Sequence, residues 1–117
     1  MERSTAYPEL LFSYGTLQDK AVQFANFGRE LAGQQDAMLG YSQSWVEITD
    51  PAVLATSGKT HHPIVAPTNE QGASVEGTVF QITAEELAAA DAYEVSDYKR
   101  VAVPLASGLT AWVYVKA

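Results

Sequence analysis

The sequence predicts a single α+β domain in which a curled, mixed β-sheet or barrel encloses a cavity and helices pack on the outside. Three observations lead to this prediction. The chain has 117 residues, close to the commonest size of one domain. Segments of strand and helix character follow one another in the order β-α-β-β, an irregular stretch, and β-α-β-β. No repeat, low-complexity segment or linker divides the chain, so we expect residues 1–117 to fold as one domain.

The first half of the chain is predicted to begin with a strand over 9–14 and a helix from Asp19 to about Leu31. Asp19 is a favourable N-cap, and Gly33 is expected to end the helix. The helix is supported by one apolar stripe at spacings i, i+3 and i+7, formed by Phe24, Phe27 and Leu31. Residues 37–48 have the aromatic and β-branched content of one or two strands.

Residues 49–74 give the weakest prediction, because turn-forming and structure-breaking residues are frequent there. Ile64 and Val65 are expected to form a short strand inside this stretch. Pro63 and Pro67 favour an edge strand or a loop over a central strand, since proline cannot donate a ladder hydrogen bond.

The last third of the chain has clearer signals. Residues 75–82 are predicted to form a strand, followed by a helix that starts after Thr83 and runs to about Glu94. Thr83 and Glu86 fit a capping box, in which each side chain accepts a hydrogen bond from the other residue's backbone.

A hairpin is predicted to close the chain. Its first strand places three apolar side chains on one face: Val101, Val103 and Leu105. Ser107 and Gly108 are expected to turn the chain in two residues, and 109–116 alternates again as the second strand.

Composition limits the compartment and the partners. The sequence has no cysteine, which excludes disulfides and fits a reducing compartment. We find neither an apolar signal region nor a membrane span, and we therefore expect a cytoplasmic protein. The net charge is −7 and the basic residues are scattered, so we expect no nucleic acid and no membrane as partner.

The segment Tyr14-Gly15-Thr16-Leu17 is the first candidate site. It joins the first strand to the first helix, and such a junction leaves backbone N–H groups free to bind an anion. Gly15 would let a ligand approach the main chain closely, and Thr16 adds a hydroxyl. The alternative is a tight strand-to-helix turn with Tyr14 in the core.

The helix near the C-terminus carries the second candidate site. Leu87, Asp91 and Glu94 share one face at spacings i, i+4 and i+7. If Leu87 points into the core, the two carboxylates face inward or lie at its margin, and burial would raise the pKa of a candidate base. The alternative places Glu94 in solvent and Asp91 in a local cap.

Other polar residues give weaker signals. His61 and His62 are adjacent, so on a strand they point to opposite faces, and we expect no metal site. Tyr98 and Arg100 share a face at the start of the next strand. Arg100 can pair with a carboxylate of the protein or of a ligand.

These motifs together resemble the γ-glutamylcyclotransferase-like proteins (AIG2-like). "LFSYGTLQ" is similar to their Tyr-Gly-Ser/Thr-Leu signature. "VEGTVFQITAEELAAADAYEVSDYKRVAV" is similar to their second block, and "AWVYV" to their closing strand. The similar segments cover roughly half of the chain, in the order found in the family. Small bacterial members and γ-glutamylamine cyclotransferases are the most similar in size.

The resemblance implies an enzyme, a cyclising transferase or amine lyase of the γ-glutamylcyclotransferase fold. Its substrate would be a γ-glutamyl amine, amide or dipeptide, which cyclises to 5-oxoproline and releases the amine without a cofactor. The residue that matches the catalytic acid/base is Glu94. The residues implied to bind substrate are Tyr14, Gly15, Thr16, Leu17, Tyr98 and Arg100. A monomer or small homo-oligomer is expected.

The sequence departs from the family pattern at three places. Ala90 stands where a leucine usually precedes the aspartate, and Val95 where glycine is frequent. Residues 42–72 have no clear match to the family's Tyr-Pro segment, which leaves the released group undefined. The alternative functions are a binding module that holds a γ-glutamyl-like molecule without turnover, and a structural or partner-binding protein of this fold.

Overall fold

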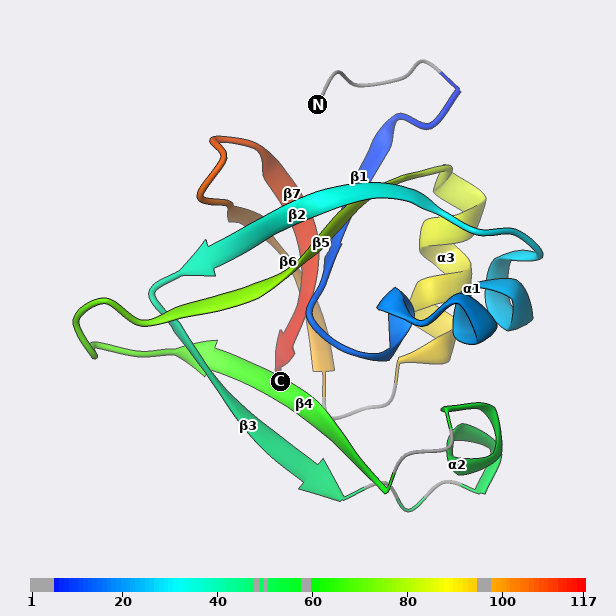
Figure 1. Ribbon diagram of the computed structural model, residues 1–117, viewed down its shortest axis with the longest axis horizontal. Helices are drawn as coiled ribbons and strands as arrows, with labels where there is room; N and C mark the ends of the chain where they lie inside the picture. The colour runs from blue at the N-terminus through cyan, green and yellow to red at the C-terminus, as the bar shows by residue number, and fades with distance from the viewer. Residues whose placement is uncertain (1–5, 48, 50, 58–59, 95–97) are drawn as a thin grey trace.

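The computed structural model describes residues 6–47, 49, 51–57, 60–94 and 98–117. Within these ranges the strands form a five-stranded sheet, in the order β2-β5-β1-β7-β6, and a two-stranded sheet of β3 and β4. The strands are β1 (Glu9–Ser13), β2 (Ala32–Leu39), β3 (Tyr41–Glu47), β4 (His61–Pro67), β5 (Ser74–Ile82), β6 (Tyr98–Pro104) and β7 (Thr110–Lys116). Figure 1 shows the larger sheet curling across the upper part of the molecule, with β3 and β4 below it.

The large sheet is mixed and strongly curled. Its central strand β1 runs antiparallel to β5 and parallel to β7. The two edges approach each other at one end, where Met38 of β2 forms a bridge with Leu105, just beyond β6. There the N–H of Ala106 also donates to the carbonyl of Ala37 at 2.8 Å. The predicted curled α+β fold is therefore confirmed, although the sheet does not close into a barrel.

Both faces of the central strands are buried, because alternate side chains of β1, β5 and β7 enter different cores. Phe12 belongs to a cluster on the inner, concave face, and Leu11 belongs to a cluster between the outer face and the helices. The same division separates Val113 from Tyr114 on β7. A strand that is buried on both sides needs a continuous apolar run, which explains the unbroken Leu10-Leu11-Phe12.

Helix α1 (Lys20–Phe27) is shorter than predicted. Asp19 caps its start as expected, accepting a hydrogen bond from the N–H of Ala21 at 2.9 Å. The helix ends at Gly28, whose φ of 69° lies in the left-handed region that favours glycine. Gly33, the predicted end, lies instead in β2, and a Cβ there would collide with Phe80 at 2.6 Å.

The shorter helix also changes which of its side chains are buried. The predicted stripe was wrong at Phe24, which is 56% exposed, whereas Val22 and Gln23 are buried. Gln23 is a polar residue in the core, and both its amide nitrogen and its amide oxygen are hydrogen-bonded. It donates to the carbonyl of Leu17 at 2.9 Å and accepts from the N–H of Leu31 at 2.8 Å.

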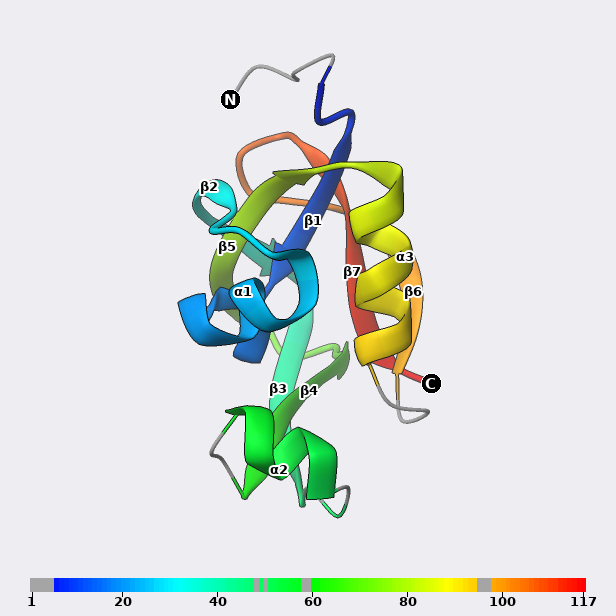
Figure 2. The same cartoon turned by 90° about the vertical axis from the view of Figure 1, so that its right-hand side faces the viewer.

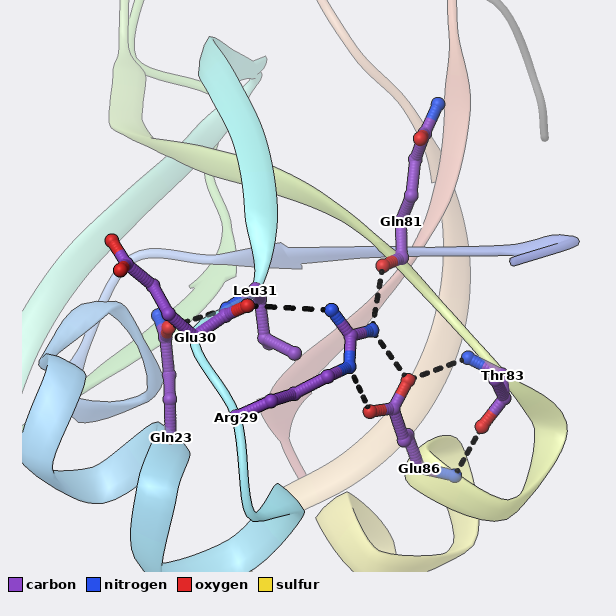
Figure 3. Close-up of polar contacts among 7 residues, drawn as sticks. All are labelled: Gln23, Arg29, Glu30, Leu31, Gln81, Thr83 and Glu86. Carbon is purple, nitrogen blue, oxygen red and sulfur yellow. Dashed lines mark hydrogen bonds and ion pairs between the residues drawn. The ribbon is translucent and has the colours of Figure 1, made fainter. Parts of the chain in front are cut away.

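Helix α3 (Ala84–Tyr93) is held against α1 by a charged network, drawn in Figure 3. The predicted capping box is confirmed, with Thr83 and Glu86 each accepting a backbone hydrogen bond from the other. Arg29, just after α1, binds both oxygens of Glu86, at 2.7 and 2.8 Å. Burial alone would raise the pKa of Glu86, but the hydrogen bonds from Arg29 and Thr83 outweigh it and lower the pKa. This network fixes the start of α3, the helix whose C-cap is Glu94.

The stretch predicted to be irregular contains a helix and a full strand. Helix α2 (Pro51–Ser57) begins with proline, which is favoured at the first helical position because its missing N–H would have no partner there. Strand β4 extends well beyond Ile64 and Val65, and among the described residues it pairs with β3 alone. Pro63 and Pro67 thus lie in an edge strand, as predicted.

The closing hairpin turns in three residues, 106–108, rather than two. Leu105 and Leu109 still pair across the turn, and Gly108 adopts a φ of 93°. Val103 and Leu105 are buried on the predicted inner face, and Val101 packs beside them. No helix in the described ranges is long and apolar enough to span a membrane.

Candidate active site

The loop after β1 uses only some of its backbone N–H groups, among them that of Gly15, which donates to the Oγ of Ser13 at 3.3 Å. Tyr14 and Gly15 lead into the 3-10 helix η1 (Thr16–Gln18). The carbonyls of Gly15, Thr16 and Leu17 accept hydrogen bonds from Gln18, Asp19 and Gln23, respectively. In the described part of the chain, no hydrogen bond engages the N–H groups of Thr16 and Leu17. Leu17 is buried as a whole residue, whereas Thr16 is partly exposed.

Gly15 lies against the two-stranded sheet. A Cβ at this position would be 3.0 Å from the Cγ of Pro63 in β4. The carbonyl of Pro63 accepts a hydrogen bond from the hydroxyl of Tyr98 at 2.5 Å. The missing side chain of Gly15 therefore makes room for β4, and a role in ligand approach remains a prediction.

Glu94 follows directly after helix α3. It is the C-cap of this helix, and its N–H donates to the carbonyl of Ala90 at 3.0 Å. The residue keeps part of its surface in contact with solvent, but its carboxyl is surrounded by protein. Burial raises its pKa from 4.5 to about 8, with no counteracting cation. The alternative that Glu94 lies freely in solvent is therefore wrong.

Three tyrosines lie within electrostatic reach of the Glu94 carboxylate. Burial raises the pKa of Tyr14, Tyr93 and Tyr114, and the negative charge of Glu94 raises each of them further. Tyr14 donates its hydroxyl to the carbonyl of Tyr114 at 2.5 Å and packs against the inner core. Tyr14 thus has a core role, as the alternative from sequence proposed, while it also faces Glu94.

A hydrogen bond joins the two candidate segments. The hydroxyls of Thr16 and Tyr93 lie 2.7 Å apart, although the residues are 77 positions apart in sequence. Tyr93 is the last residue of α3, and Thr16 is the first of η1. The loop after β1 and the end of α3 are therefore in direct contact.

Asp91 binds groups of the protein. Its carboxylate accepts a hydrogen bond from Tyr114 at 2.7 Å and pairs with the Nε of Arg100 at 2.9 Å. Arg100 also stacks over the ring of Trp112, 4.5 Å from its centroid. The side chains of Arg100 and Tyr98 are both engaged within the protein, so substrate binding by either remains a prediction.

A metal site has no support in the described part of the chain, where no group of three or more His, Asp or Glu side chains could hold an ion. His61 is exposed at the start of β4, and its Nδ1 lies 3.1 Å from the hydroxyl of Thr60. The substitution noted at Val95 lies outside the described residues.

The family can be identified from the sequence as a whole. The sequence profile described as gamma-glutamyl cyclotransferase, AIG2-like, matches residues 11–117. The chain belongs to this family. The match includes both candidate segments and also the stretch 42–72, for which the motifs alone gave no similarity.

The fold of this AIG2-like protein also occurs in solved structures of other proteins. A protein of Arabidopsis thaliana superimposes with a TM-score of 0.71 at 21% identity, over 92% of this chain and 61% of its own. A protein specific to uropathogenic E. coli gives 0.65 at 22% identity, over 93% and 79%. A gamma-glutamyl cyclotransferase gives 0.67 at 16% identity, over 93% and 66%. The chain thus spans about three fifths of the Arabidopsis protein. No curated protein matches the sequence.

The structure of this family member also identifies residues that the sequence analysis missed. Tyr93 and Tyr114 lie beside Glu94 and were not selected, although both fall in the segments quoted for the resemblance. Pro63 packs on the loop after β1 from the weakly predicted stretch. The sequence contains no local signal that brings Tyr114 near Glu94, Tyr93 to Thr16 or Pro63 to Gly15, because these partners lie far apart along the chain.

Proposed function

We propose that this protein cyclises a small γ-glutamyl compound to 5-oxoproline, with Glu94 as the general acid/base. The observation that carries the proposal is the buried carboxyl of Glu94, which lies beside the loop 14–17 in a member of this family. In the reaction, the α-amino nitrogen of the substrate attacks its own γ-carbonyl carbon. A new C–N bond closes the ring, and the bond to the leaving amine breaks.

Glu94 supplies the proton transfers that this reaction needs. Its carboxylate takes a proton from the α-ammonium group, which can then attack, and returns a proton to the leaving nitrogen. A carboxyl group with a pKa of about 8 can do both near neutral pH. A role of the loop in binding the substrate carboxylate or the oxyanion that forms at the γ-carbon is supported by Thr16, whose N–H has no partner in the described part of the chain.

Glu94→Gln tests this role. The variant keeps the size of the side chain but cannot accept a proton, so we expect it to fold, to bind 5-oxoproline, and to lose turnover by roughly 10²–10⁴-fold. Release of 5-oxoproline from a panel of γ-glutamyl amines, amides and dipeptides would measure turnover. The wild-type rate should rise with pH through about 8, as Glu94 loses its proton.

Glu85→Gln is the matched control, because it makes the same substitution at an exposed position of the same helix. Its turnover should equal that of the wild type. Retained turnover in Glu94→Gln would reject Glu94 as the catalyst. Binding of 5-oxoproline by a wild-type protein that converts no γ-glutamyl compound would instead support the binding module.

A further inference from the structure

We propose that Tyr93 is a positioning residue, whose hydroxyl bond to Thr16 holds the loop 14–17 in a fixed position relative to Glu94. This inference rests on the proposed function and deepens it. Tyr93 itself transfers no proton; it acts by keeping the groups that bind the substrate aligned with the group that removes the proton.

The position of Tyr93 suits this role. It directly precedes Glu94, so the backbone couples any displacement of one residue to the other. Its ring is partly buried and packs against the outer core, while its hydroxyl lies 2.7 Å from that of Thr16. Burial raises the pKa of the phenol, and the negative charges of Glu94 and Asp19 raise it further, as expected for a hydroxyl close to the acid/base.

The remaining hydrogen bonds of the loop lead to other elements. Tyr14 binds β7, Leu17 binds Gln23 of α1, and Gln18 accepts from Thr78 of β5 at 2.9 Å. Leu17 packs in the same apolar cluster as Leu87 of α3, but throughout the described ranges the bond from Thr16 to Tyr93 is the only hydrogen bond between this loop and α3. Without it, we expect the loop to keep its fold but to lose its alignment with Glu94.

This alignment matters because ring closure depends on geometry. The attacking nitrogen, the γ-carbonyl and the base must each be held within about 0.5 Å of their productive positions. A misplacement of 1 Å can cost about 10²-fold in rate. A loop that keeps its other contacts should move less than that. We therefore expect a loss of about tenfold when the bond is removed.

Tyr93→Phe, Thr16→Val and the double variant test the inference. Each single variant should lower kcat about tenfold and change KM less than about threefold. The double variant should be no slower than either single variant, because all three lack the same bond. Thr16→Ser keeps a hydroxyl and should restore most of the rate. The pH midpoint should stay at the wild-type value, because the phenol holds the loop through Thr16 and takes no part in the proton transfer by Glu94.

Ser107→Ala is the matched control. It also removes a hydroxyl bond between distant segments, here to Asp36 at 2.5 Å, but at the turn between β6 and β7. It should leave kcat unchanged, so a loss in the Tyr93 and Thr16 variants cannot follow from lowered stability alone.

The outcomes separate this inference from the proposed function. Additive losses, unchanged rates or a shifted pH midpoint in the variants of an active wild type would overturn the positioning role alone. If Tyr93→Phe fails to fold, Thr16→Val and Thr16→Ser still decide it. A wild-type protein without turnover would overturn the proposed function and this inference together.

Discussion

At Gly15, the absence of a side chain leaves room for Pro63. The φ of Gly15 is −131°, which other residues also adopt, so the need for glycine comes from the neighbouring ring. Packing against Pro63 is therefore one reason for glycine at this residue, and ligand binding is the second reason that we predict. A larger side chain would act first on β4 and, through the bond from Tyr98 to Pro63, on β6.

Gly15→Val should lower both stability and ligand binding. Overpacking against Pro63 is expected to cost about 1–3 kcal/mol of unfolding free energy. Pro63→Ala in the same chain removes the opposing ring atoms and should restore much of that stability, as measured by chemical denaturation. We expect protection by 5-oxoproline to remain weak in the double variant. Restored protection would make Gly15 a packing residue only.

At the scale of elements, Asp91 connects α3 to two strands. Its carboxylate meets Tyr114 of β7 and Arg100 of β6, and Arg100 in turn covers Trp112. The opposite end of the helix is fixed by Glu86 and Arg29 (Figure 3). Helix α3 is thus attached at both ends to structure outside itself, which holds Glu94 in place.

Asp91→Asn should lower the melting temperature and keep measurable turnover. The amide retains one acceptor but loses the charge that binds Arg100. Because the Asp91 side chain is 42% exposed, we expect a cost of only about 1 kcal/mol. Thermal unfolding and 5-oxoproline release would be measured on the same samples. Lost turnover at unchanged stability would show that Asp91 and Glu94 act as a catalytic pair.

At the scale of the whole molecule, the curl of the sheet creates the site. In Figure 2, α3 stands along β6 and β7, while α1 lies in front of β1 and β5. The loop after β1 thus reaches the end of α3, and β4 packs near the same loop. Burial of Glu94 follows from this arrangement, and it should make stability depend on pH.

Glu94→Gln should therefore gain stability over the wild type as the pH rises. The pKa of Glu94 is about 8 in the folded protein, above its ordinary 4.5, so the folded state binds the proton more tightly. The stability that this tighter proton binding adds to the folded state is present in full below pH 4.5, and it is lost as the pH rises through 8. At pH 9 the variant should exceed the wild type by roughly 1–4 kcal/mol.

Denaturant unfolding at pH 5 and pH 9 would measure this difference. Glu85→Gln corrects for the loss of one negative charge from a protein of net charge −7. An equal difference between Glu94→Gln and the wild type at both pH values would contradict the raised pKa.

The sequence by itself determined the features that depend on neighbouring residues. The cap at Asp19, the capping box of Thr83 and Glu86, and the apolar runs of the strands all act over a few residues, and the structure confirms them. The end of α1 was misplaced because Gly28 and Gly33 carry the same local signal. Of these two glycines, Gly33 is the one that close packing between strands requires, because a Cβ at Gly28 would contact nothing within 4 Å. Helix α2 was not predicted, because prolines such as Pro51 usually break structure, whereas Pro51 is the first residue of this helix.

Only the tertiary structure decided which of these local features meet. The sequence placed Thr16 and Glu94 in separate motifs, and the curled sheet brings them together through Tyr93. It likewise sets Pro63 against Gly15. The raised pKa of Glu94 was also decided by the tertiary structure, because desolvation depends on every segment packed around the carboxyl. Helical spacing in the sequence can indicate only which face of the helix Glu94 occupies.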